Sequence, residues 1–169
     1  MAMTESDDFD AFVAARGASL LRLGWLLCGQ APAAEDLVQE ALARAYLRWD
    51  RVIAAAAPEA YVRRILVNEY VSSRRRRSST ELPRADVDAG AVVADTADAG
   101  AARDEMWRLL ARLPRTQRAV LVLRYYEDQS DDQIAQLLGC GTSTVRSNAA
   151  RGLAALRAVA GSVDEETLP

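Results

Sequence analysis

The stretch SDDQIAQLLGCGTSTVRSNAARGLAALR, residues 130–157, decides the fold of the C-terminal part of this chain. Ser130 and Gln133 have the S-x-x-Q spacing of a capping box, which predicts that a helix begins here. Gly139 can adopt the left-handed conformation that ends a helix, and Gly141 keeps the following turn tight. The stretch therefore predicts two helices joined by a short turn, a helix-turn-helix.

The second of these helices has two different faces. Apolar residues recur at helical spacing and predict a buried stripe of Val145, Ala149, Leu153 and Leu156. The opposite side carries Arg146, Ser147, Ala150 and Arg151. A helix with this polar face suits the major groove of DNA. An ordinary antiparallel helix pair with a solvated face would show a similar pattern, so the motif alone leaves both interpretations open.

The composition favours an intracellular, helical, non-catalytic protein. Half of the 169 residues are apolar, and Ala and Leu outnumber the β-branched and aromatic residues that favour strands. The chain has no His and only two cysteines, Cys28 and Cys140, which argues against a zinc site, a disulfide framework and His-based catalysis. No apolar run approaches the length of a bilayer span, and the acidic N-terminus is no signal peptide. We expect a cytoplasmic protein without metal, cofactor, enzymatic activity or membrane insertion.

The charge is unevenly distributed along the chain. The net charge is −3, and all 21 basic residues are Arg. Residues 51–77 carry a net charge of +5 and residues 107–163 one of +4, whereas residues 78–106 between them carry −5. Since screening limits the reach of distant charges, the local field governs phosphate binding. The pattern indicates two DNA-contacting modules and a connector, although solvated charges alone could produce it.

The periodicity predicts an all-α protein of two small helical domains joined by a flexible acidic linker. We expect domains at residues 1–79 and 103–160, a linker at 80–102 and an acidic tail at 161–169. The first domain should contain helices at about 8–28, 34–49 and 58–76, with a loop at 50–59 whose alanines could extend a helix. The second should contain a helix that ends at Pro114, another at about 116–126 and the helix-turn-helix.

Two segments of the first domain carry further polar groups. Residues 34–41 (AEDLVQEA) place Asp36, Gln39 and Glu40 on one helical face, which either is simply solvated or docks a partner through Arg or Lys. Residues 61–77 (YVRRILVNEYVSSRRRR) end in an Arg run that can bind phosphates. In this segment Tyr61, Asn68 and Tyr70 could stack on or bond to unpaired bases, or the two tyrosines could be core residues.

A third segment, residues 113–126 (LPRTQRAVLVLRYY), mixes an apolar stripe with Arg115, Arg118 and Arg124. These arginines could bracket the DNA backbone beside the recognition helix, or they could solvate the surface.

Together these blocks resemble a bacterial sigma factor of the extracytoplasmic-function (ECF) type, in the sigma-70 family, and especially the short actinobacterial kind often labelled the SigE family. AEDLVQEAL is similar to region 2.2 and YVRRILVNEYVSSRRRR to regions 2.3 and 2.4. LPRTQRAVLVLRYYEDQSDDQIAQLLGC with TVRS is similar to region 4. The blocks occur in the family's order over residues 9–157.

The resemblance implies a protein that binds core RNA polymerase and directs promoter recognition, DNA melting and transcription initiation. It assigns docking on the β′ clamp helices, with the β flap as a further partner surface, to Asp36, Leu37, Gln39 and Glu40. It assigns contacts with the −10 element to Tyr61, Arg63, Arg64, Asn68, Arg74, Arg75, Arg76 and Arg77. It assigns contacts with the −35 element to Arg115, Arg118, Ser143, Thr144, Arg146, Ser147, Asn148 and Arg151.

The chain departs from the family's pattern in two places. Relatives typically have Val-Gly-Thr-Val-Lys-Ser and then a long polar residue, whereas here TSTVRS is followed by Asn148, Ala149 and Ala150. The shorter side chains of the recognition helix reach fewer base edges, so we expect −35 recognition to depend on DNA shape and backbone contacts. The segment 50–59, which corresponds to the loop that captures a flipped −10 base, is unusually rich in Ala.

Two questions about partners stay open at this point. An anti-sigma factor is implied by the family only, since no residue encodes it. A free-standing helix-turn-helix regulator is the alternative function, but it leaves the DLVQE block and the first Arg-rich helix without a role.

Overall fold

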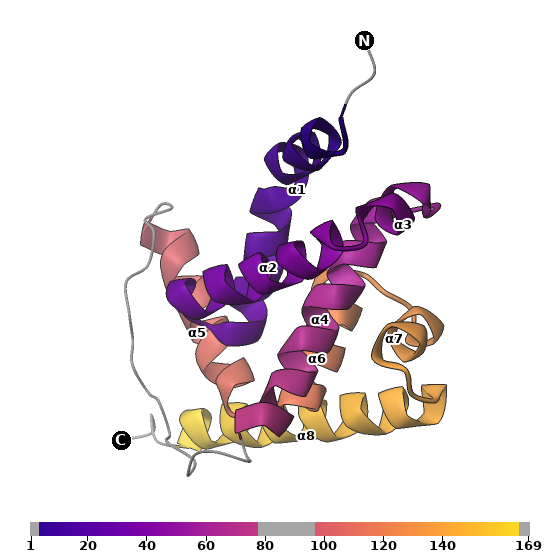
Figure 1. The fold of residues 1–169 in the computed structure, drawn as a ribbon. Coiled ribbons are helices and arrows are strands. Elements are labelled where there is room, and N and C mark those ends of the chain that lie inside the picture. Colours follow the sequence, from indigo (N-terminus) through magenta and orange to yellow (C-terminus); the bar gives the residue numbers. More distant parts are fainter. Residues whose placement is uncertain (1–3, 78–96, 166–169) are drawn as a thin grey trace. The chain divides into compact units, whose positions relative to one another are not determined.

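The structure is a computed structural model that describes residues 4–77 and 97–165 (Figure 1). The chain divides into two compact units, Met1–Ala91 and Val92–Pro169, called here the N-terminal and C-terminal units. The N-terminal unit contains α1 (Glu5–Cys28), α2 (Ala31–Tyr46), α3 (Trp49–Ala54) and α4 (Pro58–Arg77). The C-terminal unit contains α5 (Ala97–Ala111), α6 (Arg115–Leu121), the π-helical turn η1 (Val122–Tyr126), α7 (Asp131–Leu138) and α8 (Thr142–Glu165). The predicted all-α fold is confirmed.

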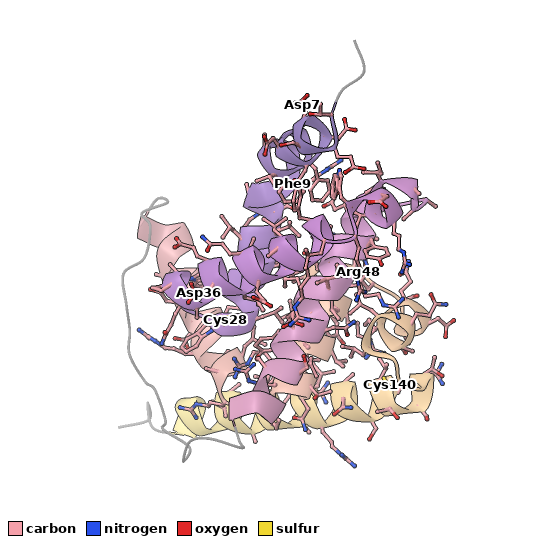
Figure 2. The ribbon with its side chains drawn as sticks, viewed as in Figure 1. Asp7, Phe9, Cys28, Asp36, Arg48 and Cys140 are labelled. Carbon is pink, nitrogen blue, oxygen red and sulfur yellow. The ribbon has the colours of Figure 1, made fainter. Side chains whose placement is uncertain are left out.

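The core of the N-terminal unit lies where α2 packs against α1 and α4. Its fully buried side chains come from all four helices and include Leu20, Leu23, Leu27, Ala41, Val52, Val62 and Leu66. A cluster of aromatic rings extends this core between α1 and α3. Trp49 packs edge-on against Phe9 and Phe12, with ring centroids 5.1 and 5.4 Å apart, and Phe9, labelled in Figure 2, also meets Tyr46 at 4.9 Å. This cluster fixes the N-terminal half of α1 to the rest of the unit.

The first turn of α1 is closed by a capping box that the sequence analysis overlooked. Thr4 Oγ1 accepts a hydrogen bond from the Asp7 N–H at 3.3 Å, and Asp7 Oδ2 accepts one from the Thr4 N–H at 3.1 Å. Hydrogen bonding with the Thr4 side chain, and secondarily with its backbone, holds the pKa of the Asp7 carboxyl below its usual value. The signal, T-x-x-D before an apolar run, was present in the sequence.

The structure corrects the expectation that no segment is long enough to span a bilayer. At 24 residues, α1 is, within the described ranges, the one helix that meets the criteria of length and composition for a membrane span. Its apolar character has an explanation in the fold, because Leu20, Leu23 and Leu27 are buried against the neighbouring helices. Arg16 near its middle forms an ion pair with Glu59 of α4 at 3.1 Å.

The segment 50–59, expected to be a loop, is largely helical. Helix α2 ends at Tyr46, and Trp49 opens the separate helix α3, which runs to Ala54. Val52 anchors the short helix by being fully buried, whereas the alanines at residues 55–57 lie outside it. The chain turns extended at Ala55, and α4 begins three residues later at Pro58, because a proline is tolerated in the first turn of a helix. Tyr46, the last residue of α2, is 49% exposed.

The C-terminal unit packs α6 and α7 against α8, with α5 and η1 alongside. Its buried side chains include Leu110, Leu113, Val120, Leu123, Ile134, Val145 and Ala149. Of the predicted stripe on α8, Leu153 and Leu156 are only half-buried, whereas Gly152 is buried. A Cβ at Gly152 would lie 2.9 Å from Leu121 Cδ1, so the absence of a side chain permits the close approach of α8 to α6.

Three boundaries in this unit differ from the expected ones. The helix predicted at 116–126 is α-helical only to Leu121, and continues as η1, in which the Glu127 N–H reaches back to the Val122 carbonyl at 3.1 Å. The predicted linker, 80–102, falls mainly on residues 78–96, outside the described ranges, and α5 already begins at Ala97. The predicted tail, 161–169, is helical as far as Glu165 because α8 continues through it.

Candidate functional site

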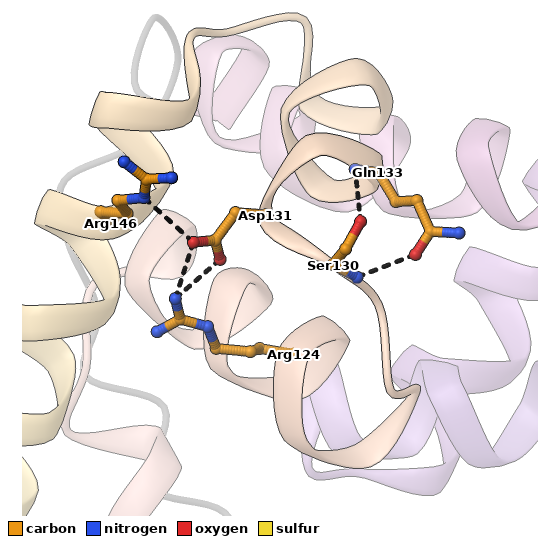
Figure 3. Close-up of polar contacts among 5 residues, drawn as sticks. All are labelled: Arg124, Ser130, Asp131, Gln133 and Arg146. Carbon is orange, nitrogen blue, oxygen red and sulfur yellow. Dashed lines mark hydrogen bonds and ion pairs between the residues drawn. The ribbon is translucent and has the colours of Figure 1, made fainter.

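The helix-turn-helix consists of α7, a turn at residues 139–141 and α8. Ser130 Oγ accepts a hydrogen bond from the Gln133 N–H at 3.2 Å, and Gln133 Oε1 accepts one from the Ser130 N–H at 2.8 Å (Figure 3). Gly139 has a φ of 66° and donates its N–H to the Ala135 carbonyl. The predicted capping box and left-handed glycine are both confirmed.

Helix α8 carries its predicted DNA-contacting side chains on the exposed surface. Five of these residues are exposed: Ser143, Thr144, Arg146, Ser147 and Arg151. Val145 and Ala149 are buried on the opposite side of the helix. Asn148 is half-buried, and its amide donates to the Thr144 carbonyl at 3.0 Å. The exposed surface of α8 therefore offers hydroxyl and guanidinium groups, while Asn148 is turned back onto its own helix.

Asp131, the first residue of α7, joins three elements of the C-terminal unit through its carboxylate. Arg124 Nη2, from η1, donates to Oδ1 and Oδ2 of Asp131 at 2.7 and 2.9 Å. Arg146 Nε, from α8, donates to Oδ2 at 3.3 Å. Both contacts are visible in Figure 3. Arg124, which the sequence left between phosphate contact and solvation, thus holds an ion pair within the unit instead.

Arg118 has a structural role that the sequence did not indicate. Its Nε donates to the Leu110 carbonyl at 2.9 Å, and its Nη2 donates to the carbonyls of Ala111 and Leu113, each at 3.2 Å. Leu110 and Ala111 lie at the C-terminal end of α5 and Leu113 in the turn after it, where the last carbonyls of a helix lack their usual i+4 donors. The Nε and Nη2 donors of Arg118 thus give it a role at the end of α5 that differs from the predicted phosphate contact. Arg115, at the start of α6, is half-buried.

In the N-terminal unit, the predicted docking residues lie on α2. Asp36, labelled in Figure 2, is exposed, as are Gln39 and Glu40, while Leu37 is half-buried. Glu40 Oε1 accepts a hydrogen bond from Arg44 Nε at 2.8 Å. The four residues therefore share one helix and combine two exposed carboxylates, an amide and a partly covered apolar side chain.

Arg44 also links α2 to α4. Its Nη1 lies 3.1 Å from Oε1 of Glu69, which is almost completely buried. A buried carboxylate requires such a partner, since removing a charge from water without compensation is costly. This bridge could not be predicted, because the spacing between residues 44 and 69 does not reveal it.

The predicted −10 residues on α4 have different surroundings. Arg63 is half-buried, and its Nη2 bonds to Glu59 Oε1 at 2.6 Å and to Ser19 Oγ at 3.3 Å. Arg64 is exposed, whereas Tyr61 and Asn68 are half-buried. Tyr70 is buried, which supports the core interpretation for this ring. The backbone of α4 continues through residues 74–77, but the side chains of that Arg run lie outside the described ones.

Comparison with known proteins matches the two units to two parts of one family. Sigma-70 region 2 matches residues 12–80, and Sigma-70 region 4 matches residues 103–156. The RNA polymerase sigma-E factor of Streptomyces avermitilis is 36% identical over 157 residues, which cover 93% of this chain and 87% of that protein. The chain belongs to the sigma-70 family.

Further relatives place the chain in the ECF group of this family. The RNA polymerase sigma-E factor of Streptomyces coelicolor is 34% identical over 92% of this chain and 87% of its own length. The ECF RNA polymerase sigma factor SigL of Mycobacterium tuberculosis is 33% identical over 83% of this chain and 81% of its own length. The resemblance drawn from the sequence is confirmed.

A solved structure supports the fold. The sigma factor RpoE in complex with the anti-sigma factor NepR, from Bartonella quintana, is similar with a TM-score of 0.70 and 23% identity, covering 91% of this chain and 97% of that chain. In family terms, region 2 comprises most of α1 with α2, α3 and α4, and region 4 comprises α6, η1, α7 and parts of α5 and α8. Sigma factors as a class are soluble transcription proteins and not enzymes.

Proposed function

We propose that this chain is a promoter-specificity subunit that binds core RNA polymerase, directs it to promoters and supports transcription initiation. The observation that carries this proposal is the presence of sigma-70 region 2 and region 4 in one chain, in that order, each in its own helical unit. A free-standing helix-turn-helix regulator would need only the second unit. The function that we propose is non-catalytic and is performed in the cytoplasm.

The two units divide the work in this proposal. The α2 surface of Asp36, Leu37, Gln39 and Glu40 docks on the clamp helices of the β′ subunit. Helix α4 contacts the −10 element through Tyr61, Arg63, Arg64, Asn68 and the Arg run at 74–77. Helix α8 enters the major groove of the −35 element with Ser143, Thr144, Arg146, Ser147 and Arg151, while Arg115 of α6 contacts a phosphate. What supports this is the exposure of the α2 and α8 side chains and the charge that they carry.

The docking surface is tested by changing Gln39 and Glu40 to alanine together. We expect the affinity for core polymerase to fall about tenfold or more, equivalent to ~1.4 kcal/mol or more, because an amide and a carboxylate that bond to the partner are lost. The measurement is the dissociation constant with purified core enzyme. The control is Asp10→Ala, which removes an exposed carboxylate from α1. Unchanged affinity in the double variant, with an unchanged circular dichroism spectrum, would refute the docking role.

The role of α8 is tested with Arg151→Ala. Since Arg151 is exposed on the recognition helix, we expect the rate of initiation by the holoenzyme to fall about tenfold on a promoter with its −35 element, for the loss of one base or phosphate contact. On a template without that element the loss should be small. Arg157→Ala, which removes another exposed arginine later on the same helix, serves as the matched control. Equal losses on both templates would count against a −35 contact by Arg151.

A further inference from the structure

The carboxylate of Asp131 is held more firmly than the arginine that it contacts on α8. Its side chain is only 20% exposed, and both of its oxygens accept hydrogen bonds from Arg124 Nη2. Its backbone lies in the first turn of α7, which the Ser130–Gln133 capping box fixes. Asp131 is therefore a rigid acceptor at the edge of the recognition helix.

Arg146, in contrast, would be free to adopt many conformations without this acceptor. Its side chain is 69% exposed, and long exposed side chains lose considerable entropy when they are ordered. The hydrogen bond from its Nε to Asp131 Oδ2 at 3.3 Å restricts the conformations of the guanidinium. The guanidinium is planar and carries five N–H donors in fixed directions. With Nε engaged, the two terminal nitrogens, Nη1 and Nη2, still form a parallel pair of donors that points away from the carboxylate.

We propose that Asp131 is a positioning residue for promoter recognition, which orients Arg146 so that Nη1 and Nη2 donate to O6 and N7 of one guanine in the −35 element. The inference rests on the proposed function, in which α8 enters the major groove. A bidentate bond from Arg to the O6 and N7 of guanine is the commonest specific contact in that groove. Orienting the guanidinium before binding reduces the entropy lost on contact, so a fixed carboxylate sharpens the discrimination against other bases. Most side chains of the recognition helix are short, and Arg146 would provide its one strong contact with a base.

The test measures base preference with the whole protein in holoenzyme. Core polymerase is loaded with wild-type chain, Arg146→Ala, Asp131→Asn or Asp132→Asn, and each holoenzyme is bound to a promoter library that is randomised in the −35 element. We expect the wild type to prefer guanine about fivefold or more at one position, and Arg146→Ala to abolish that preference. Asp131→Asn should weaken the preference at the same position and leave the others unchanged. Asp132→Asn, an exposed carboxylate removed from the same turn of α7, should preserve it.

Three results would overturn the inference. Unaltered guanine preference in Asp131→Asn shows that the carboxylate does not orient Arg146. Equal weakening at all positions, accompanied by a lower melting temperature, shows a purely structural role. If Arg146→Ala lowers the salt dependence of promoter binding and leaves the base preference unchanged, Arg146 contacts a phosphate.

Two further arms keep the test decisive. If Asp131→Asn fails to fold, Asp131→Glu retains the charge and moves the carboxylate by one methylene, and it should give an intermediate guanine preference. An unchanged preference in that variant counts against the inference. If the wild type shows no −35 preference at all, or forms no complex with core polymerase, the proposed function itself fails.

Discussion

Replacing Trp49 with alanine is expected to lower the free energy of unfolding of the N-terminal unit by about 4 kcal/mol, the usual cost of deleting a buried aromatic ring. Trp49 is 3% exposed and contacts the rings of both Phe9 and Phe12. Its loss would open a cavity between α1 and α3 and release the N-terminal half of α1. Urea unfolding followed by circular dichroism measures the change. Hydrogen exchange should show lost protection in α1–α4 and retained protection in α6–α8.

Trp49→Phe is the matched control for this prediction. It keeps an aromatic ring against Phe9 and Phe12 and removes an indole N–H that, in the part of the chain described by the structure, has no hydrogen-bond acceptor. We therefore expect it to cost only about 1 kcal/mol, because the smaller cavity is partly offset by the removal of a buried unsatisfied donor. Equal destabilisation by the two variants would contradict the role assigned to the ring cluster.

Replacing Arg118 with methionine is expected to lower the free energy of unfolding of the C-terminal unit by about 3 kcal/mol. The change removes a charged donor group from the carbonyls of Leu110, Ala111 and Leu113. A hydrogen bond from a charged group has a net value of about 1.5–3 kcal/mol, and water can replace part of the lost bonds because Arg118 is only half-buried. Methionine retains much of the aliphatic volume of arginine, so the fall in the free energy of unfolding measures the contribution of the hydrogen bonds. Thermal unfolding and hydrogen exchange of the α5–α6 corner measure it.

The same variant separates this structural role from a contact with DNA phosphate. Loss of a phosphate contact would reduce the salt dependence of promoter binding by about one in logarithmic slope, whereas loss of a cap leaves that slope unchanged. Arg112→Met, which removes an exposed arginine just after α5, should affect stability little. A normal stability together with a reduced slope for Arg118→Met would contradict the structural role.

The local features of the helix-turn-helix could be predicted because their causes lie within a few residues of sequence. The capping box needs only Ser130 and Gln133, and the end of α7 needs only a residue that tolerates the φ of 66° seen at Gly139. The same logic would have found the box at Thr4 and Asp7. The family blocks could likewise be recognised from the order of short segments, and this order carried the functional assignment.

The partners of the charged side chains could not be predicted, because they are set by packing between helices. Arg118, Arg124 and Arg63 all read as surface arginines in the sequence, yet each bonds to a group on another element. Gly152 permits the close contact between α8 and Leu121, which the sequence does not reveal. Helix α3 was missed because the alanines at residues 54–57 are compatible with either loop or helix, although only Ala54 belongs to α3 and the burial of Val52 anchors that helix.

The most direct test of the function as a sigma factor is run-off transcription with purified core RNA polymerase on a promoter library, in the presence and absence of the chain. We predict that core enzyme with the chain initiates at a distinct set of promoters that share one −35 and −10 pair, and that core enzyme alone does not. We also predict that the Gln39 and Glu40 double variant loses these transcripts. The same transcripts with and without the chain would contradict the assignment of this protein as a sigma factor.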